Sequence, residues 1–243
     1  MTTLPAFWHL LFEIAAYSIG AQIYWRTRRR DPLQADRFAQ IGIVAGLVLG
    51  AAAGSKMAYW FEHPQYAFQD FPSLVPLLAG KSIVGGLLGG LIGVEWAKRL
   101  QGITQSTGDA LIWPLAIGIG IGRIGCFLAG LSDATYGNPT SVPWAINFGD
   151  GIPRHPTQLY EIAALLTLAW VVTGPGARLA QIPGDRFKLF LAAYLAWRLV
   201  IDTIKPVPYE YWPGLSGIQW LCLAGLLYYS RHLFRMLRPW ATR

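Results

Sequence analysis

The chain has 243 residues, of which 53% are hydrophobic and only 14% are charged. Together with a positive mean hydropathy of +0.36, this composition is typical of integral membrane proteins. The net charge of +7 would suit a nucleic-acid partner, but the basic residues sit in alternate loops instead of forming the basic face that such binding needs. We therefore exclude nucleic acid as a partner.

Seven apolar segments have about the 17–25 residues that cross a hydrocarbon core about 30 Å thick. In lipid each segment must be helical, because its backbone polar groups have to be satisfied within the segment. The sequence therefore predicts an all-α integral membrane protein with about seven transmembrane helices in a single membrane domain, residues 1–243. The segments are 7–25, 39–61, 80–97, 109–129, 157–173, 187–204 and 216–232.

The arrangement of basic residues predicts the orientation of these segments. Arginine and lysine cluster after the first, third, fifth and seventh segments, and the other loops hold almost none. By the positive-inside rule the N-terminus is outside and the C-terminus is cytoplasmic, which requires an odd number of spans. The opening MTTLPAFWHL has no basic region and no small-residue cleavage site, so we expect the first helix to be retained rather than cleaved as a signal peptide.

Two loops on the predicted outer side are longer than a connection requires. The loop at 62–79 mixes aromatic residues with prolines, and the loop at 129–156 is dense in glycine, proline, aspartate and asparagine. Long structured loops usually carry function.

Glycines recur four residues apart in IVGGLLGGLIG, residues 83–93. Small residues at this spacing allow two membrane helices to approach closely. The same glycines, Gly85 and Gly86 among them, would also leave room for a lipid chain, and the sequence does not separate these two uses.

Arg123 lies in the middle of the fourth segment, within GIGIGRIGCFLAG, and no acid lies within a helical turn of it. An arginine at the centre of a membrane helix costs about 3 kcal/mol on insertion scales, so it needs a partner. One alternative is an acid on another helix, Glu13 or Glu161. The other is a phosphate ligand, because the planar guanidinium binds two phosphate oxygens at once.

A second polar cluster is predicted where the fifth segment begins, in PRHPTQLYE, residues 153–161. Pro156 suits the first turn of a helix, which would place His155 at the N-terminal edge of that helix. So many polar side chains entering a membrane helix indicate a lined cavity. At helical spacing, four of these residues fall near one face, with Tyr160 beside them: Arg154, His155, Gln158 and Glu161.

Two other pairs of residues favour a structural role. Arg198 and Asp202 are spaced i,i+4 in the sixth segment, so their charges can meet on one helix face. Cys126 and Cys222 lie in apolar segments and are expected to be small buried side chains, with neither a disulfide framework nor a metal-ligand spacing.

Several motifs resemble those of the prolipoprotein diacylglyceryl transferase family. They are GRIGCFLAG, YGNPTSVPW and PRHPTQLYE in this order and spacing, with GKSIVGGLLGGLIG before them and RLVIDTIKP after them. The resemblance implies a multi-pass enzyme of the bacterial inner (cytoplasmic) membrane. It would move diacylglyceryl from phosphatidylglycerol, or a similar anionic phospholipid, to the thiol of a lipobox cysteine in a preprotein, and release glycerol phosphate.

The resemblance also implies roles for individual residues. Arg123 and Lys205 match the two cations expected at the leaving phosphate, where fixed positive charge stabilises the transition state. His155 and Glu161 are expected to transfer protons, and neither a cofactor nor a metal is expected. The residues expected to bind substrate are Glu13, Gly85, Gly86, Arg123, Gly125, Cys126, Asp133, Tyr136, Gly137, Arg154, Gln158 and Tyr160.

The sequence departs from the family pattern at three positions that concern the thiol proton. Val84 stands where the family has a histidine thought to act as base, Cys126 stands where it has an asparagine, and Leu131 aligns with its glutamate, for which Asp133 is a substitute. A general base must be within hydrogen-bond reach of its proton, which leaves His155, Glu13 and Glu161 as the possibilities. The same departures keep two alternatives open: another acceptor for the same donor, and a non-catalytic phospholipid-binding membrane protein.

Overall fold

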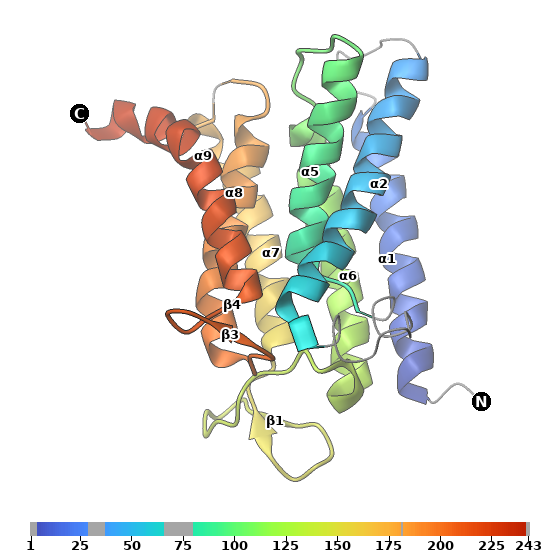
Figure 1. Cartoon of the computed structure of the whole chain (residues 1–243), viewed down its shortest axis with the longest axis vertical. Coiled ribbons are helices and arrows are strands. Elements are labelled where there is room, and N and C mark those ends of the chain that lie inside the picture. Colours follow the sequence, from blue (N-terminus) through green and yellow to red (C-terminus); the bar gives the residue numbers. More distant parts are fainter. Residues whose placement is uncertain (1–3, 29–36, 66–79, 181, 242–243) are drawn as a thin grey trace. The chain divides into compact units, whose positions relative to one another are not determined.

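The computed structural model describes residues 4–28, 37–65, 80–180 and 182–241 (Figure 1). Within these ranges the chain is mostly helical, as the sequence predicts. The long helices are α1 (Leu4–Arg28), α2 (Arg37–Glu62), α5 (Ile83–Leu100), α6 (Ile112–Ala129), α7 (Thr157–Thr173), α8 (Asp185–Ile201) and α9 (Gly217–Ala241).

Short elements join the long helices. Two antiparallel hairpins pair β1 (Ile146–Asn147) with β2 (Pro153–Arg154) and β3 (Glu210–Tyr211) with β4 (Leu215–Ser216). The 3-10 helices are η1 (Gly108–Leu111), η2 (Gly130–Asp133), η3 (Pro175–Arg178) and η4 (Asp202–Ile204). The predicted loop at 129–156 is therefore structured, with η2 and the first hairpin in it, whereas residues 66–79 of the other predicted loop lie outside the described residues.

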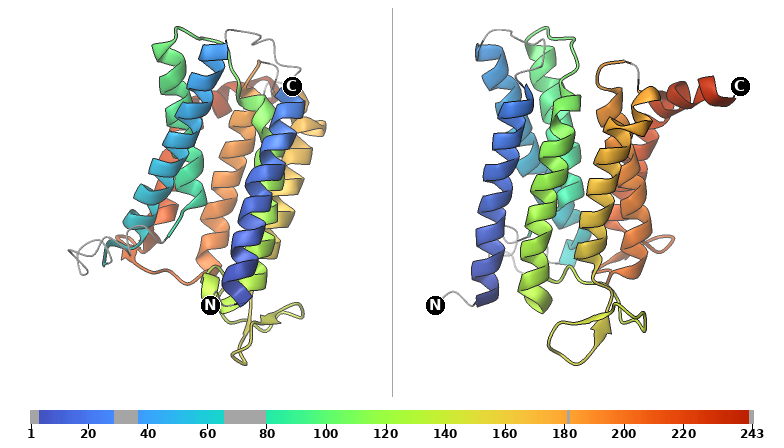
Figure 2. Two further views of the ribbon diagram at one scale, coloured as in Figure 1. Left: turned by 90° about the vertical axis from the view of Figure 1, so that its right-hand side faces the viewer. Right: turned by 180° about the vertical axis from the view of Figure 1, so that it is seen from behind.

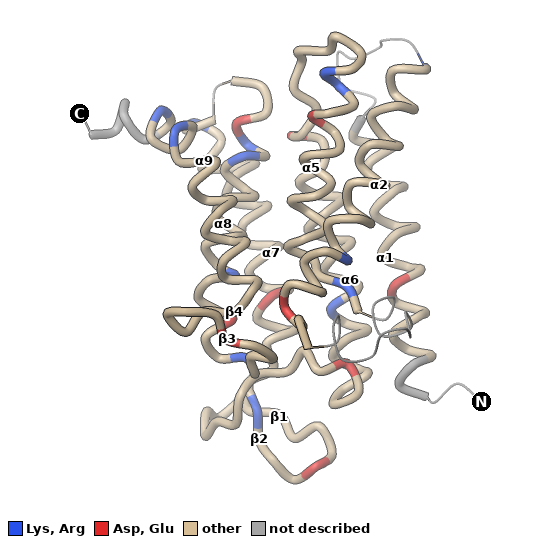
Figure 3. The backbone as a smooth tube through the Cα atoms, in the orientation of Figure 1, with Lys and Arg blue, Asp and Glu red and all other residues tan. Residues whose placement is uncertain are grey.

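Each of the seven predicted segments coincides with a long helix, and the bounds of α7 are those predicted. By length and composition alone, two stretches of the described residues are apolar enough to cross a membrane: Arg37–Glu62 and Gly108–Asp133. Charged residues interrupt the apolar helices at few places (Figure 3). The number of spans, their orientation and the single membrane domain stay predictions.

The chain divides into two compact units. The first comprises residues 1–31, 106–206 and 230–243, and the second comprises residues 32–105 and 207–229.

In the first unit, α1 packs along α6, α6 along α7 and α7 along α8 (Figure 2). Gly125 permits the first of these contacts, because a Cβ atom there would lie 2.6 Å from the Cβ atom of Phe12. Asp109 of η1 fixes the start of α8 by accepting hydrogen bonds from the backbone N–H groups of Gly184 (2.8 Å) and Phe187 (2.9 Å). Such a carboxylate satisfies donors that the helix itself leaves unpaired.

In the second unit, α2 and α5 meet along two rows of glycines. A Cβ atom added to Gly89 would come closer than 3.0 Å to the carbonyl oxygen of Gly50, a separation that Cβ atoms essentially never show. Gly85 lies in the same contact, against Gly54, so packing accounts for its spacing. A Cβ atom on Gly86 would have no neighbour nearer than 3.7 Å.

Candidate active site

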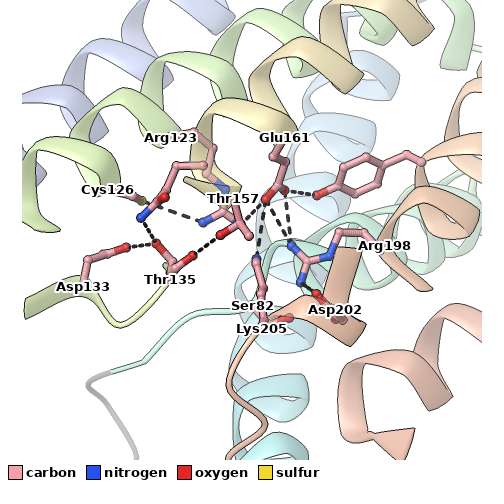
Figure 4. Close-up of polar contacts among 12 residues, drawn as sticks. Ser82, Arg123, Cys126, Asp133, Thr135, Thr157, Glu161, Arg198, Asp202 and Lys205 are labelled. Carbon is pink, nitrogen blue, oxygen red and sulfur yellow. Dashed lines mark hydrogen bonds and ion pairs between the residues drawn. The ribbon is translucent and has the colours of Figure 1, made fainter. Parts of the chain in front are cut away.

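The polar side chains of the first unit converge on Glu161, at the start of α7 (Figure 4). The Glu161 side chain has no exposed surface, and Arg123 NH2 lies 2.8 Å from its Oε2 atom. Arg198 NH1 lies 3.3 Å from Oε1 and 3.2 Å from Oε2, and the Tyr194 hydroxyl donates a hydrogen bond of 2.6 Å to Oε1. A buried carboxylate is tolerated only with such partners.

The same cluster carries an excess of positive charge. Asp202 accepts a hydrogen bond of 2.7 Å from Arg198 NH2, which confirms the predicted pair, and Lys205 Nζ lies 3.9 Å from Glu161 Oε2. Three cations thus face two carboxylates, a balance that attracts an anion. Lys205 follows η4, outside α8, and its pKa is lowered to about 7 by burial and by the neighbouring charge of Arg198.

Arg123 is held in one orientation by Glu161, and other nitrogen atoms of its guanidinium remain available to a ligand. Of the two acids that the sequence offered, Glu161 is the one that forms the ion pair with it, whereas Glu13 accepts a hydrogen bond from Tyr17. Arg123 NH1 lies 3.9 Å from Cys126 Sγ, and its buried Nε atom has no hydrogen-bond partner among the described residues. A buried donor without a partner is unusual and indicates a place for a ligand or water.

The loop that follows α6 closes over the start of α7. Thr157 Oγ1 donates a hydrogen bond of 2.7 Å to the carbonyl of Thr135, and Gln158 Nε2 donates one of 3.3 Å to the Thr135 hydroxyl. Gly137 is required here, because a Cβ atom on it would lie 2.6 Å from the Cβ atom of His155. The predicted site residues Gly137 and Gln158 therefore belong to the contact between this loop and the start of α7.

The structure corrects the position of Arg154. We expected it near one face of the fifth helix, but α7 begins at Thr157 with Pro156 as its N-cap, and Arg154 lies in β2. A proline disfavours helical backbone in the residue before it, here His155, so the helix does not extend back to Arg154. Arg154 NH1 pairs with Asp150 Oδ2 at 2.6 Å, and its guanidinium carbon lies 5.0 Å from the centre of the Tyr136 ring.

His155 and Tyr160 form a second cluster with an aromatic partner. His155 Nδ1 lies 3.2 Å from the Tyr160 hydroxyl, which also accepts a hydrogen bond of 2.5 Å from Trp144 Nε1. The predicted site residues His155 and Tyr160 thus belong to this second cluster, whereas Arg123, Glu161 and Lys205 belong to the cluster around Glu161.

Sequence reasoning missed Tyr194 and limited Arg198 to its pair with Asp202. A regular pattern was present, because Tyr194, Arg198 and Asp202 follow one another at intervals of four residues. Residues at this spacing share one helix face, so the pattern predicts a polar stripe along α8.

A buried cluster of charged side chains among apolar helices is typical of the class of membrane proteins that carry a polar functional site. The model of the prolipoprotein diacylglyceryl transferase family matches residues 2–234. The chain therefore belongs to this family of bacterial membrane transferases, which confirms the resemblance seen in the motifs.

Three similar proteins share the name phosphatidylglycerol–prolipoprotein diacylglyceryl transferase. The one from Pseudomonas aeruginosa (strain LESB58) is 31% identical over 235 residues, which cover 87% of this chain and 83% of the relative. The one from Bordetella parapertussis is 32% identical over 204 residues, or 78% of this chain and 72% of the relative. The one from Glaesserella parasuis is 34% identical over 168 residues, which cover 66% of this chain but only 59% of the relative.

Proposed function

We propose that this chain moves the diacylglyceryl group of phosphatidylglycerol onto the thiol of a lipobox cysteine in a prolipoprotein. The observation that carries the proposal is the buried, net-positive cluster around Glu161 in a chain of this family. The proposal includes seven spans in the bacterial inner membrane with the N-terminus outside. The start of α7, with Glu161 close to it, then lies toward the outer surface, where the preprotein's cysteine arrives.

Arg123 and Lys205 receive the phosphate in this proposal. Among the described residues the Nε atom of Arg123 has no hydrogen-bond partner, and its NH1 atom lies 3.9 Å from the Cys126 sulfur, a weak acceptor, so both atoms are placed to bind phosphate oxygens. As the bond between carbon and phosphate oxygen breaks, the phosphodiester becomes a more highly charged monoester. Cations fixed beside it stabilise the transition state more than the ground state.

Glu161 acts as a positioning residue rather than as a proton acceptor. Its carboxylate already accepts hydrogen bonds from Tyr194 and Arg198 and pairs with Arg123, and such partners favour its charged form. A group of residues around His155 guides the acceptor peptide into the site. Its other members are Tyr136, Gly137, Arg154, Gln158 and Tyr160. These residues come from the loop after α6 and the first turns of α7.

The test is direct transfer by the reconstituted full-length chain. Vesicles that contain phosphatidylglycerol with a labelled acyl chain are mixed with a lipobox peptide, and label on the peptide and glycerol phosphate in solution are followed. We expect transfer by the wild type and by the control Arg186→Gln, whose arginine is exposed at the start of α8. We expect Arg123→Gln to lose transfer.

Transfer that survives in Arg123→Gln would overturn the assigned role of this arginine. Phosphatidylglycerol binding that depends on Arg123, without transfer to the peptide, would favour the alternatives of another acceptor or of a phospholipid-binding protein. The motive for these alternatives is Val84, which is 1% exposed in α5 and offers no proton acceptor.

A further inference from the structure

We propose that His9, Cys126 and Asp133 form a zinc site that binds the acceptor cysteine as a thiolate, an inference that rests on the function proposed above. The sequence predicted no metal site, because these residues come from α1, α6 and η2 and have no recognisable ligand spacing. The structure brings one nitrogen, one sulfur and one oxygen donor together.

The distances between the three donor atoms suit a tetrahedrally coordinated zinc ion if the donor atoms move slightly closer together. His9 Nε2 lies 3.1 Å from Asp133 Oδ1, and the three donor atoms all lie within 4.8 Å of one another. Zinc bonds of about 2.0–2.3 Å place tetrahedral ligands about 3.3–3.8 Å apart. The widest pair therefore needs to close by about 1 Å, which a change of side-chain rotamer supplies.

The surroundings hold the ligands as a metal site requires. A histidine that binds a metal usually directs its other ring nitrogen to a carboxylate, and the Glu13 carboxylate lies near His9, with Oε2 3.9 Å from Nδ1. The other oxygen of Asp133 accepts a hydrogen bond from the Thr135 hydroxyl. This hydrogen bond orients one of the three ligands.

The site is open to substrate and adjacent to the proposed phosphate site. The His9 side chain is 41% exposed, and the three protein ligands leave one position of a tetrahedral zinc ion for the substrate, as is typical of catalytic zinc. Cys126 Sγ lies 3.9 Å from Arg123 NH1, which places a zinc-bound acceptor beside the donor's phosphate. With Cys126 and Asp133 both ionised, the ion's two charges are neutralised and do not repel Arg123.

The chemistry requires no protein base. A thiol that binds zinc loses its proton to solvent, because a coordinated thiol is deprotonated. The thiolate sulfur forms a bond to the glyceryl carbon, the bond from that carbon to the phosphate oxygen breaks, and its electron pair stays on the oxygen of the departing glycerol phosphate. The products are a thioether, glycerol phosphate and one proton in solution. Zinc thus activates the acceptor thiol, which Val84, at the position of the family's histidine, cannot do.

Metal binding is tested separately from transfer. The full-length chain, purified without a polyhistidine tag and stripped with a chelator, is titrated with zinc against a chromophoric chelator and with cobalt for its absorption spectrum. We expect one zinc per chain in the wild type and in Cys222→Ala, which removes the other, buried cysteine. Cys126→Ser is expected to lose affinity by about 100-fold or more and to lack the sulfur-to-cobalt charge-transfer band, and His9→Gln to lose affinity likewise.

The transfer assay separates failure of this proposal from failure of the proposed function. Transfer that stops on chelation and returns with zinc supports the site. Stoichiometric zinc binding that depends on Cys126, without transfer to the lipobox peptide, supports the metal site while the proposed function fails. Undiminished transfer by the stripped protein, or zinc binding that is unchanged in Cys126→Ser, overturns the metal site.

Discussion

Replacing Glu161 by glutamine removes one negative charge from the buried cluster and keeps the size of the side chain. The amide oxygen can still accept the hydrogen bond from Tyr194, but Arg123 and Arg198 lose their common carboxylate. Breaking a buried ion pair by removing one partner costs about 3–5 kcal/mol, because the remaining charges stay buried. Since domains have only about 5–15 kcal/mol of stability, we expect Glu161→Gln to lower the free energy of unfolding by a large fraction.

Unfolding of the purified variant in detergent, followed by circular dichroism across a denaturant series, measures this loss. The matched control is Glu210→Gln, because Glu210 is exposed in β3. A surface substitution usually changes stability by within about 0.5 kcal/mol, so the control should unfold near the wild type. Equal stability of Glu161→Gln and Glu210→Gln would refute the view that Glu161 holds the cluster together.

Three further predictions concern other parts of the chain. Gly89→Ala should destabilise the chain by about 1–3 kcal/mol through overpacking. Gly86→Ala should leave thermal unfolding unchanged, because the new Cβ would have no neighbour nearer than 3.7 Å. Equal melting temperatures of the two variants would contradict the close packing at Gly89. The pKa of Lys205 is lowered to about 7, so affinity for phosphatidylglycerol vesicles should fall as the pH rises above this value, because the anion prefers the protonated amine. Lys205→Arg should remove this pH dependence. The same pH profile in the wild type and the variant would argue against this role. Asp109→Ala should lower stability by about 0.5–2 kcal/mol, since the start of α8 loses its capping carboxylate; an unchanged melting temperature would exclude that contribution.

Local features of this chain follow from the sequence. The seven helices were predicted because apolar length is a property of each segment alone, and the pair of Arg198 and Asp202 because its spacing lies within one helix. The start of α7 is also local, because Pro156 disfavours helical backbone in the residue before it, His155.

Contacts between helices could not be predicted from the sequence. Arg123 had two possible acids and a possible ligand, and only the packing of α6 on α7 selects Glu161. His9 and Asp133 are far apart in the chain, and their 3.1 Å contact depends on how α1 lies along α6. A helical pattern indicates which side chains share a face but not which helix covers that face.

The pairing of Arg123 with Glu161 has a consequence for the entropy of donor binding. A free arginine side chain carries about 2 kcal/mol of rotamer entropy at room temperature, which a binding site normally loses when its ligand arrives. Here the guanidinium is already immobilised against a buried carboxylate, so folding absorbs most of that loss before any lipid is present. In the proposed function, a phospholipid of the bilayer then binds an arginine that is already ordered, and more of its contact energy remains for distorting the bond that breaks.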